Sequence, residues 1–263
     1  MAKKIGIIQF PGSNCERETV NALQYYGMDP QLLRWTTPPA VFHNYDAYII
    51  PGGFSFQDRV RAGVIAAKLP IMGDIVNAAN SGKLVLGICN GCQILAESGL
   101  VPDTTHTQHI EMALAPNQKD THSHGFICDW VFVTPKKPKQ NVFTSLFEPT
   151  DIIPVPINHG EGRFVFQSTA QKTVSHFKYC TSSGEENTDY PTNPNGTSHN
   201  ISGIGNKKGN VFAMMPHPER AYLCRQIPSW IPGEWPSKKK SFFVDEANAP
   251  GPWEKLFIAL KEH

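Results

Sequence analysis

A short turn motif, Gly-x-Cys-x-Gly at residues 87–91, constrains the fold of this chain more than any other feature. It follows the apolar run 84–86 and precedes the helix-like segment 92–97. In a nucleophile elbow, a strand turns sharply into a helix, and glycines flank the central residue because a Cβ atom there would collide with the turn. A thiol at a helix N-terminus is favoured as thiolate, and the next backbone N–H faces a developing oxyanion. Cys89 is therefore the candidate nucleophile.

Other interpretations of this cysteine remain open at this point. Cys89 and Cys92 also form a C-x-x-C pair, which is typical of a redox dithiol or of half a zinc site, and a cysteine in an apolar stretch often only packs. The sequence offers no second C-x-x-C pair and no H-x₃₋₅-H pair to complete a zinc site. In an elbow, Cys92 lies one turn into the helix, where we expect it to pack rather than react.

A histidine cluster precedes Cys128 and invites a zinc hypothesis of its own. Its spacing matches no established ligand pattern, and histidines in polar loops are commonly solvated. We therefore predict no metal site in the chain. The histidines concerned are His106, His109, His122 and His124.

A general base and its orienting group are offered near the other end of the sequence. His217 follows the apolar run 211–213, so it emerges from a predicted strand end, where open α/β sheets collect functional side chains. Glu219 can return to the imidazole, and the flanking Pro216 and Pro218 restrict the backbone between them. Together with Cys89 they make a Cys-His-Glu triad plausible.

A Gly-Gly turn follows another predicted strand, residues 45–50. Backbone N–H groups of Gly52 and Gly53 are suitable oxyanion donors, because no side chain shields them from a bound carbonyl. By itself a Pro-Gly-Gly sequence indicates only a turn.

These motifs belong to a larger set that carries a resemblance. The set comprises residues 10–15 (Phe-Pro-Gly-Ser-Asn-Cys), 52–55 (Gly-Gly-Phe-Ser) with Asp58 and 61–63 (Arg-Ala-Gly), 87–93, 158–164 (Asn-His-Gly-Glu-Gly-Arg-Phe), 190–196 (Tyr-Pro-Thr-Asn-Pro-Asn-Gly) and 215–220 (Met-Pro-His-Pro-Glu-Arg). It resembles class I (triad) glutamine amidotransferases, and several segments are similar to the glutaminase subunits of phosphoribosylformylglycinamidine synthases of purine biosynthesis.

The resemblance implies a reaction. Cys89 would attack the side-chain amide of glutamine, His217 would protonate the departing ammonia, and Glu219 would orient the imidazole. A γ-glutamyl thioester would form and then be hydrolysed. The oxyanion would be held by backbone N–H groups of Gly52 or Gly53 and of Asn90.

The same resemblance implies that Gln93 helps to hold the substrate. Glu161 is an alternative acid, but we expect its glycine-flanked loop to line the glutamine pocket or the subunit interface instead. It implies no cofactor in this chain. ATP and Mg²⁺ would serve a large synthetase subunit, with a small accessory subunit in the same complex.

The sequence departs from the family pattern at two positions. Where the family commonly reads Gly-Gly-Phe-Ser-Tyr-Gly-Asp, this chain has Phe56-Gln57-Asp58, so the resemblance does not imply the conformation of this loop. Asp129 stands where the family usually carries Arg, and we expect this reversal to alter a surface or subunit contact rather than the chemistry.

Composition excludes several classes of partner. A formal net charge of +1 over 263 residues gives no reason to invoke nucleic acid or an anionic membrane. The run 5–10 is too short for a signal peptide, and no stretch is long enough for a membrane span. The six scattered cysteines then indicate reduced thiols in a cytoplasm.

The length and the pattern of apolar runs predict a single α/β domain over residues 1–263, with a doubly wound, mostly parallel sheet. The resemblance implies that this sheet is of the class I glutamine amidotransferase-like, or flavodoxin-like, kind. Expected strands are 5–8, 31–35, 45–50, 83–88, 126–133, 152–155 and 211–213; expected helices lie around 20–25 (opened by a Ser13 capping box, with Gly27 as C-cap), 64–67, 75–79, 92–97 and 253–260. We expect a small added antiparallel layer from the second half.

Residues 184–209 read as a long connection, and the aromatic residues of the 227–252 tail are expected to pack onto the domain or dock a partner. Two rival functions remain. One is a stand-alone cysteine amidohydrolase or peptidase of the same fold, and the other is a non-catalytic regulatory subunit.

Overall fold

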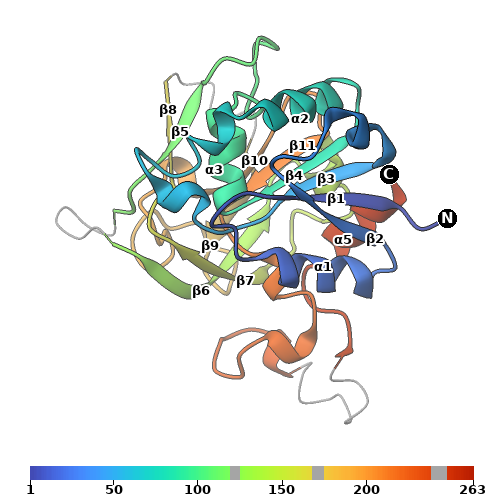
Figure 1. The fold of residues 1–263 in the computed structure, drawn as a ribbon. Coiled ribbons are helices and arrows are strands. Elements are labelled where there is room, and N and C mark those ends of the chain that lie inside the picture. The colour runs from blue at the N-terminus through green and yellow to red at the C-terminus, as the bar shows by residue number, and fades with distance from the viewer. Residues whose placement is uncertain (119–124, 168–174, 238–247) are drawn as a thin grey trace.

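A nine-stranded sheet runs through the whole computed structural model, which describes residues 1–118, 125–167, 175–237 and 248–263 (Figure 1). Its strand order is β2-β1-β3-β4-β11-β10-β9-β6-β7. These strands are β1 (Lys4–Gln9), β2 (Asp29–Arg34), β3 (Ala47–Ile50), β4 (Leu84–Ile88), β6 (Ile127–Pro135), β7 (Ile153–His159), β9 (Ser175–Cys180), β10 (Ile201–Gly205) and β11 (Val211–Met214). A separate pair, β5 (Met112–Ala115) and β8 (Arg163–Phe166), forms a two-stranded antiparallel sheet.

Helices cover both faces of the sheet. Figure 1 shows α2 and α3 on one side and α1 and α5 on the other, as a doubly wound arrangement requires. The α-helices are α1 (Glu16–Tyr25), α2 (Pro70–Asn80), α3 (Asn90–Glu97) and α5 (Glu254–Glu262). Short 3₁₀ segments occupy Pro39–Asn44, Ser55–Asp58, Ala66–Lys68, Pro138–Gln140, Val142–Thr144, Ser198–Asn200, Pro218–Arg220 and Cys224–Gln226.

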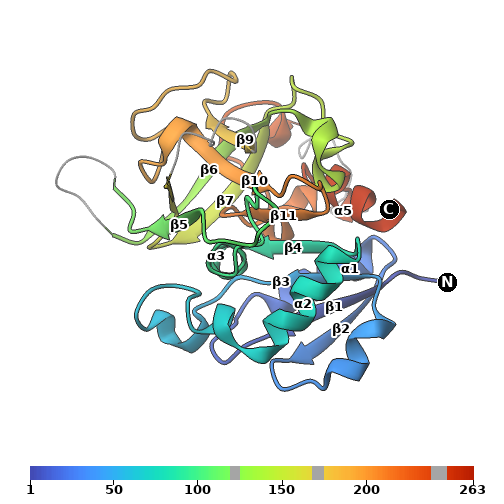
Figure 2. The same cartoon turned by 90° about the horizontal axis from the view of Figure 1, so that it is seen from above.

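The sheet divides into a parallel and an antiparallel half, which Figure 2 shows side by side. Strands β2, β1, β3, β4 and β11 pair in parallel, and β11 through β7 pair antiparallel. Strand β4 lies inside the parallel half, so all five of its residues are buried, which is why it reads as an apolar run. The predicted fold class, with its small antiparallel addition, is confirmed.

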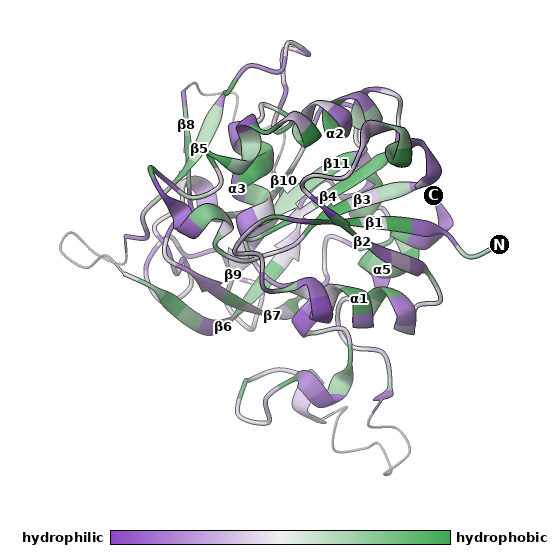
Figure 3. Ribbon diagram, viewed as in Figure 1, coloured by the Kyte–Doolittle hydropathy of each residue, from purple (hydrophilic) through white to green (hydrophobic). Residues whose placement is uncertain are grey.

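The core joins the end of the chain to the antiparallel half, and Figure 3 shows hydrophobic residues concentrated on the central strands. Trp253, just before α5, is fully buried, and its indole N–H donates to the Pro154 carbonyl at 3.1 Å. Its ring meets Phe147 and Phe177 edge-on, with centroids 5.8 and 5.4 Å apart. No helix in the described part of the chain is long and apolar enough to cross a bilayer.

Two local predictions in the first hundred residues were wrong. Ser13 does not cap α1, because its hydroxyl accepts from the Phe10 amide at 3.1 Å and the helix begins at Glu16, behind Cys15. Gly27 does follow the end of α1, with φ +76°. The helix expected around 64–67 is only a turn followed by the 3₁₀ segment Ala66–Lys68.

The connection expected over 184–209 contains β10, which the sequence analysis missed. Ile201 and Ile204 are buried between β9 and β11, and a Cβ atom on Gly203 would lie 2.8 Å from the Phe212 ring. The strand exists because its neighbours supply the packing, whereas glycines at 203 and 205 remove the propensity that would signal it.

The 227–252 tail packs onto the domain only in part. Ile231 is buried and Trp235 packs against the core, whereas Trp230 is 68% exposed. Phe242 and Phe243 lie outside the described residues.

Candidate active site

The elbow forms as the motif predicts. Cys89 lies between β4 and α3 with φ 52° and ψ −104°, a strained backbone conformation for a residue with a side chain. A Cβ atom on Gly87 would lie 2.6 Å from the Gly91 carbonyl oxygen, so this flanking position has no room for a side chain. The Cys89 thiol is buried and points toward the Asn158 carbonyl at 3.6 Å.

The strand that leads to His217 is the immediate neighbour of β4. In β11, Met214 pairs with Ile88, and the Cys89 amide donates to the Met214 carbonyl at 2.8 Å. The His217 amide then donates to the Pro156 carbonyl of β7 at 2.9 Å. Because parallel neighbours end at the same edge, the predicted nucleophile and base lie side by side although 128 residues separate them.

His217 and Glu219 form a buried hydrogen-bonded pair. Nδ1 of His217 lies 2.6 Å from Oε1 of Glu219, and the side chains are 2% and 0% exposed. Burial opposes charge on the imidazole, but the Glu219 carboxylate and the Cys89 and Cys15 thiols outweigh it and hold the pKa of His217 well above its ordinary value. Nε2 is buried and makes no hydrogen bond to any described residue.

A second thiol, that of Cys15, also lies beside the imidazole. Its sulfur is 4.0 Å from Nδ1 of His217 and accepts from Nη2 of Arg220 at 3.1 Å. Burial is the main cause that raises the pKa of Cys15, and Nδ1 is already engaged by Glu219. Cys89 therefore fits a nucleophile better, because it lies on the elbow, whereas the imidazole nitrogen that faces Cys15 is already bonded to Glu219.

The Gly-Gly loop is clamped by residues 11–15. The Gly52 carbonyl accepts from the amides of both Asn14 and Cys15 at 3.2 Å, and the Phe54 amide donates to the Gly12 carbonyl at 2.9 Å. With that carbonyl engaged, the Gly52–Gly53 peptide presents its N–H on the other side. The Gly53 amide makes no hydrogen bond to any described residue, as the predicted oxyanion role requires.

The side chains of the site pack so closely around Gly52 that no side chain fits at this position. A Cβ atom there would lie 2.7 Å from Cε1 of His217, 3.0 Å from Sγ of Cys15 and 3.4 Å from Cβ of Cys89. Gly52 is therefore required so that the imidazole and both thiols can meet.

The predicted residues Asn90 and Gln93 belong to one side-chain network. Nδ2 of Asn90 donates to Oε1 of Gln93 at 2.8 Å and to Oδ1 of Asp58 at 3.3 Å. Nε2 of Gln93 donates to the Glu161 carbonyl at 2.6 Å, while the Ser55 amide donates to Oδ1 of Asn90 at 3.1 Å. The buried Gln93 side chain is thus engaged within the protein, and the network ties the elbow to the loop after Gly53.

Two carboxylates lie beside this network. Burial and repulsion by Glu161 raise the pKa of Asp58 to about 6. Oε2 of Glu161 accepts from the Ala62 amide at 3.1 Å, and Glu161 makes no contact with His217 in the described structure that would support its role as an alternative acid.

The loop that departs from the family pattern keeps a left-handed conformation. Gln57 has φ 61° and ψ 26°, and Phe56 and Asp58 also have positive φ. The bulky residue therefore adopts a conformation that glycine takes freely. Asp129, the other departure, is exposed on β6.

Several site residues were missed by sequence reasoning. Cys15 and Arg220 were quoted only as parts of motifs, and no spacing rule brings them together across 205 residues. Cys92 is fully buried in α3, as predicted, and all six cysteines are free thiols. His106 and His109 are exposed, whereas His122 and His124 lie outside the described residues.

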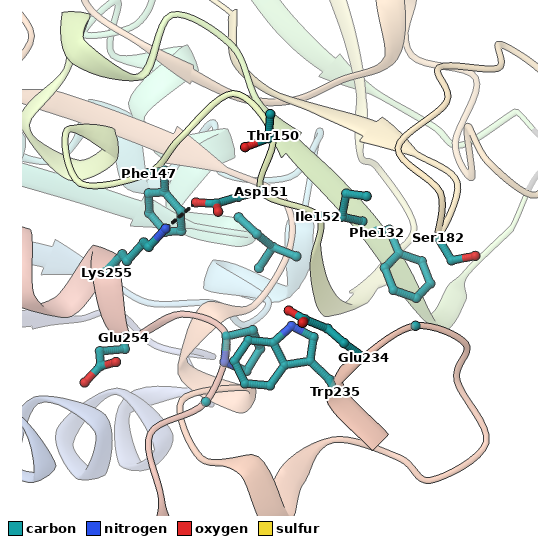
Figure 4. A pocket seen from close by; sticks show the side chains of 14 residues that line it. Phe132, Phe147, Thr150, Asp151, Ile152, Ser182, Glu234, Trp235, Glu254 and Lys255 are labelled. Atoms are coloured by element: carbon teal, nitrogen blue, oxygen red, sulfur yellow. Dashed lines mark hydrogen bonds and ion pairs between the residues drawn. The ribbon is translucent and has the colours of Figure 1, made fainter. Parts of the chain in front are cut away.

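A separate cavity of about 500 Å³ lies between the antiparallel half and the start of α5 (Figure 4). The Asp151–Lys255 ion pair, 2.5 Å long, lies at its wall beside Phe147, and Trp235 lines another part of the cavity. None of the predicted site residues lines this cavity.

Comparison with known proteins settles the family. Residues 2–262 match the CobB/CobQ-like glutamine amidotransferase domain. The chain belongs to this glutamine amidotransferase family. The PurQ subunit of phosphoribosylformylglycinamidine synthase from Methanothrix thermoacetophila is 40% identical over 252 residues, which cover 90% of this chain and 94% of that protein. The PurQ subunit from Synechocystis sp. is 43% identical over 221 residues, covering 82% and 91%.

Solved structures agree with this assignment. The structure of PurLQS from Thermotoga maritima includes a chain that is 34% identical, with a TM-score of 0.70 and coverage of 91% of this amidotransferase and 96% of that chain. A glutamine amidotransferase from Methylobacillus flagellatus, at 17% identity, a TM-score of 0.51 and coverage of 88% and 75%, shares the fold. The resemblance found in the motifs is confirmed.

Proposed function

We propose that this amidotransferase is the glutaminase subunit of phosphoribosylformylglycinamidine synthase, with Cys89 as nucleophile, His217 as acid and base, and Glu219 as the group that orients His217. The contact that carries the proposal is the buried 2.6 Å hydrogen bond between His217 and Glu219, set beside the elbow thiol. It engages Nδ1 and leaves Nε2 without a partner, and in this proposal Nε2 activates the thiol.

In the first half of the reaction, the Cys89 thiolate attacks the side-chain amide carbon of glutamine. The carbonyl oxygen becomes an oxyanion, which the N–H groups of Gly53 and Asn90 stabilise. Collapse of this intermediate breaks the C–N bond, and Nε2 of His217 gives its proton to the leaving nitrogen. The products are ammonia and a γ-glutamyl thioester.

In the second half, His217 takes a proton from water, which attacks the thioester. The C–S bond breaks, glutamate leaves and the thiolate returns, so the net reaction is glutamine plus water to glutamate plus ammonia. Glu219 stabilises the imidazolium formed in this step. The Gln93 side chain is hydrogen-bonded to Asn90 and to the Glu161 carbonyl, so in this proposal its role in binding substrate is indirect.

Ammonia released to bulk water at neutral pH becomes ammonium, which is not a nucleophile. A partner must therefore receive it directly, and the names of the relatives and of the PurLQS structure support a synthetase in that role. The proposal includes a small accessory subunit, ATP and Mg²⁺ used by the synthetase rather than by this chain, and a cytoplasmic location.

Glutamate release tests the proposal. It is measured for this chain alone and with the synthetase subunit, formylglycinamide ribonucleotide, ATP and Mg²⁺, beside a Cys89→Ser variant and a Cys128→Ser control at an exposed thiol. We expect slow release from the isolated chain, strong stimulation by the partner, and loss only in Cys89→Ser. Absence of glutamine hydrolysis under every condition would overturn the proposal.

A further inference from the structure

Three side chains near the base carry metal-binding atoms that the proposed reaction does not need together. Sγ of Cys15, Nδ1 of His217 and a carboxylate oxygen of Glu219 all lie within 4.8 Å of one another, and all three residues are buried. Thiolate, imidazole and carboxylate are the ligands that Zn²⁺ takes in proteins. We propose that Cys15, His217 and Glu219 form a Zn²⁺ site whose occupation switches off the base.

The observed distances are close to those that zinc needs. Bond lengths of about 2.0–2.3 Å in a tetrahedral site place ligand atoms about 3.3–3.6 Å apart. The gap between Nδ1 of His217 and Glu219, now 2.6 Å, must open, and the 4.0 Å gap between Nδ1 and Cys15 must close slightly. Small side-chain rotations suffice, and Asn14, whose Oδ1 lies 3.0 Å from Sγ of Cys15, offers an oxygen for the fourth position.

An unsatisfied atom points to the same site. Oε2 of Glu219 is buried and has no hydrogen-bond partner within the described structure. A buried carboxylate oxygen without a partner is costly, and a cation offsets that cost. This oxygen belongs to a fully buried side chain beside the Cys15 thiol, so it is an independent sign that the cluster can accept a positive ion.

The negative charges of the proposed ligands would balance the charge of a Zn²⁺ ion. A thiolate at Cys15 and the Glu219 carboxylate together neutralise Zn²⁺. The Arg220 guanidinium, 3.1 Å from Sγ, opposes the dication but stabilises the thiolate that binds it. The thiol proton of Cys15 and the Nδ1 proton of the His217 imidazolium both pass to water on binding, so the site fills at the expense of two protons.

Occupation would change which nitrogen of His217 holds the proton. A neutral imidazole that coordinates a metal through Nδ1 carries its hydrogen on Nε2. Nε2 then cannot take a proton from water or from Cys89, and Glu219 no longer orients the ring. Zinc at this site would inhibit glutamine hydrolysis reversibly, a consequence that rests on the proposed function, whereas the binding itself does not.

The test is zinc affinity, measured by competition with a chromophoric chelator on the whole chain. We expect one Zn²⁺ per chain, with affinity unchanged in Cys89→Ser and in the exposed control Cys128→Ser. Cys15→Ser and Glu219→Gln should each weaken binding, by at least about 100-fold for the thiolate ligand. Circular dichroism on every variant separates loss of the site from loss of the fold.

Cobalt substitution identifies the sulfur directly. The thiolate-to-metal absorption band of the Co²⁺ form should persist in Cys89→Ser and vanish in Cys15→Ser. The reverse pattern would place the metal on Cys89 and His217 and overturn the proposal, as would the absence of stoichiometric binding. Because neither readout involves glutamine, failure of the proposed function would leave both results interpretable.

Discussion

Gly91 packs so tightly against Ile50, the last residue of β3, that a Cβ atom on the glycine would overlap the Ile50 carbonyl oxygen. The elbow helix α3 can approach the sheet only because this position lacks a side chain. The thiol of Cys89 is thus placed by backbone contact two residues away from it.

Substitution of Gly91 should therefore destabilise the fold. We expect Gly91→Ala to lower the free energy of unfolding by about 3 kcal/mol, since a clash with backbone cannot be relieved by rotation of a side chain. Gly73→Ala is the matched control, because Gly73 lies in α2 with open space around it and should gain about 0.5–1 kcal/mol. Urea titration measures both, and equal effects would contradict the account.

The ion pair between Arg61 and Glu97 should contribute more to the free energy of unfolding than an exposed ion pair does. Both contacts are 2.6 Å, and the Glu97 carboxylate is 2% exposed at the C-terminal end of α3, where the helix dipole disfavours it. We expect Arg61→Met to cost about 2–3 kcal/mol, discounted because Arg61 is 45% exposed, and Glu97→Met in the same chain to restore much of it.

The exposed pair Lys139–Glu148 provides the comparison. Lys139→Met should change the free energy of unfolding by less than about 1 kcal/mol in the same titration. A loss at Arg61 as small as that at Lys139 would show that Glu97 finds other compensation.

The left-handed backbone at Gln57, where the chain departs from the family pattern, should be measurably strained. A left-handed conformation costs an L-residue about 1–2 kcal/mol, and the greater freedom of glycine in the unfolded chain offsets part of the gain. We expect Gln57→Gly to raise the free energy of unfolding by up to about 1 kcal/mol, whereas Gln24→Gly, on the exposed side of α1, should lower it. Destabilisation at both positions would refute this interpretation.

The raised pKa of Asp58 predicts how the free energy of unfolding changes with pH. Its folded pKa, about 6, lies above the ordinary 3.8, so folding favours the protonated form. Its stabilising contribution is complete below about pH 3.8 and is lost as the pH rises through about 6. Asp58→Asn should therefore become more stable relative to the natural chain between about pH 4 and pH 7. Urea titrations at a series of pH values measure the free energies of unfolding of both proteins, and a difference that stays constant over this range would contradict the prediction.

The parts of the site that depend on local pattern could be predicted. The elbow at Cys89, the strand end before His217 and the return to Glu219 each occupy a few consecutive residues. That β4 and β11 are neighbours was not predicted and is shown by the structure. The alternation of strands and helices over the first hundred residues likewise indicated the parallel half of the sheet.

The rest depends on contacts between distant segments. Cys15 meets His217 and Arg220 only because the loop after β1 folds over the Gly-Gly turn, and nothing in the spacing indicates this. Strand β10 was missed because tertiary packing, rather than intrinsic propensity, makes it a strand. The sequence predicted Ser13 as a helix cap, but its hydroxyl oxygen accepts a hydrogen bond from the Phe10 amide in a tight turn before the helix.

The central claim, that Cys89 and not the neighbouring Cys15 is the nucleophile activated by His217, is tested most directly by covalent labelling. The chain is treated with an electrophilic diazoketone analogue of glutamine and the modified peptide is identified by mass spectrometry, beside a Glu219→Gln variant. The account predicts one label, on Cys89, formed much more slowly in the variant. A label on Cys15, or equal labelling of Cys89 and the exposed Cys128, would contradict it.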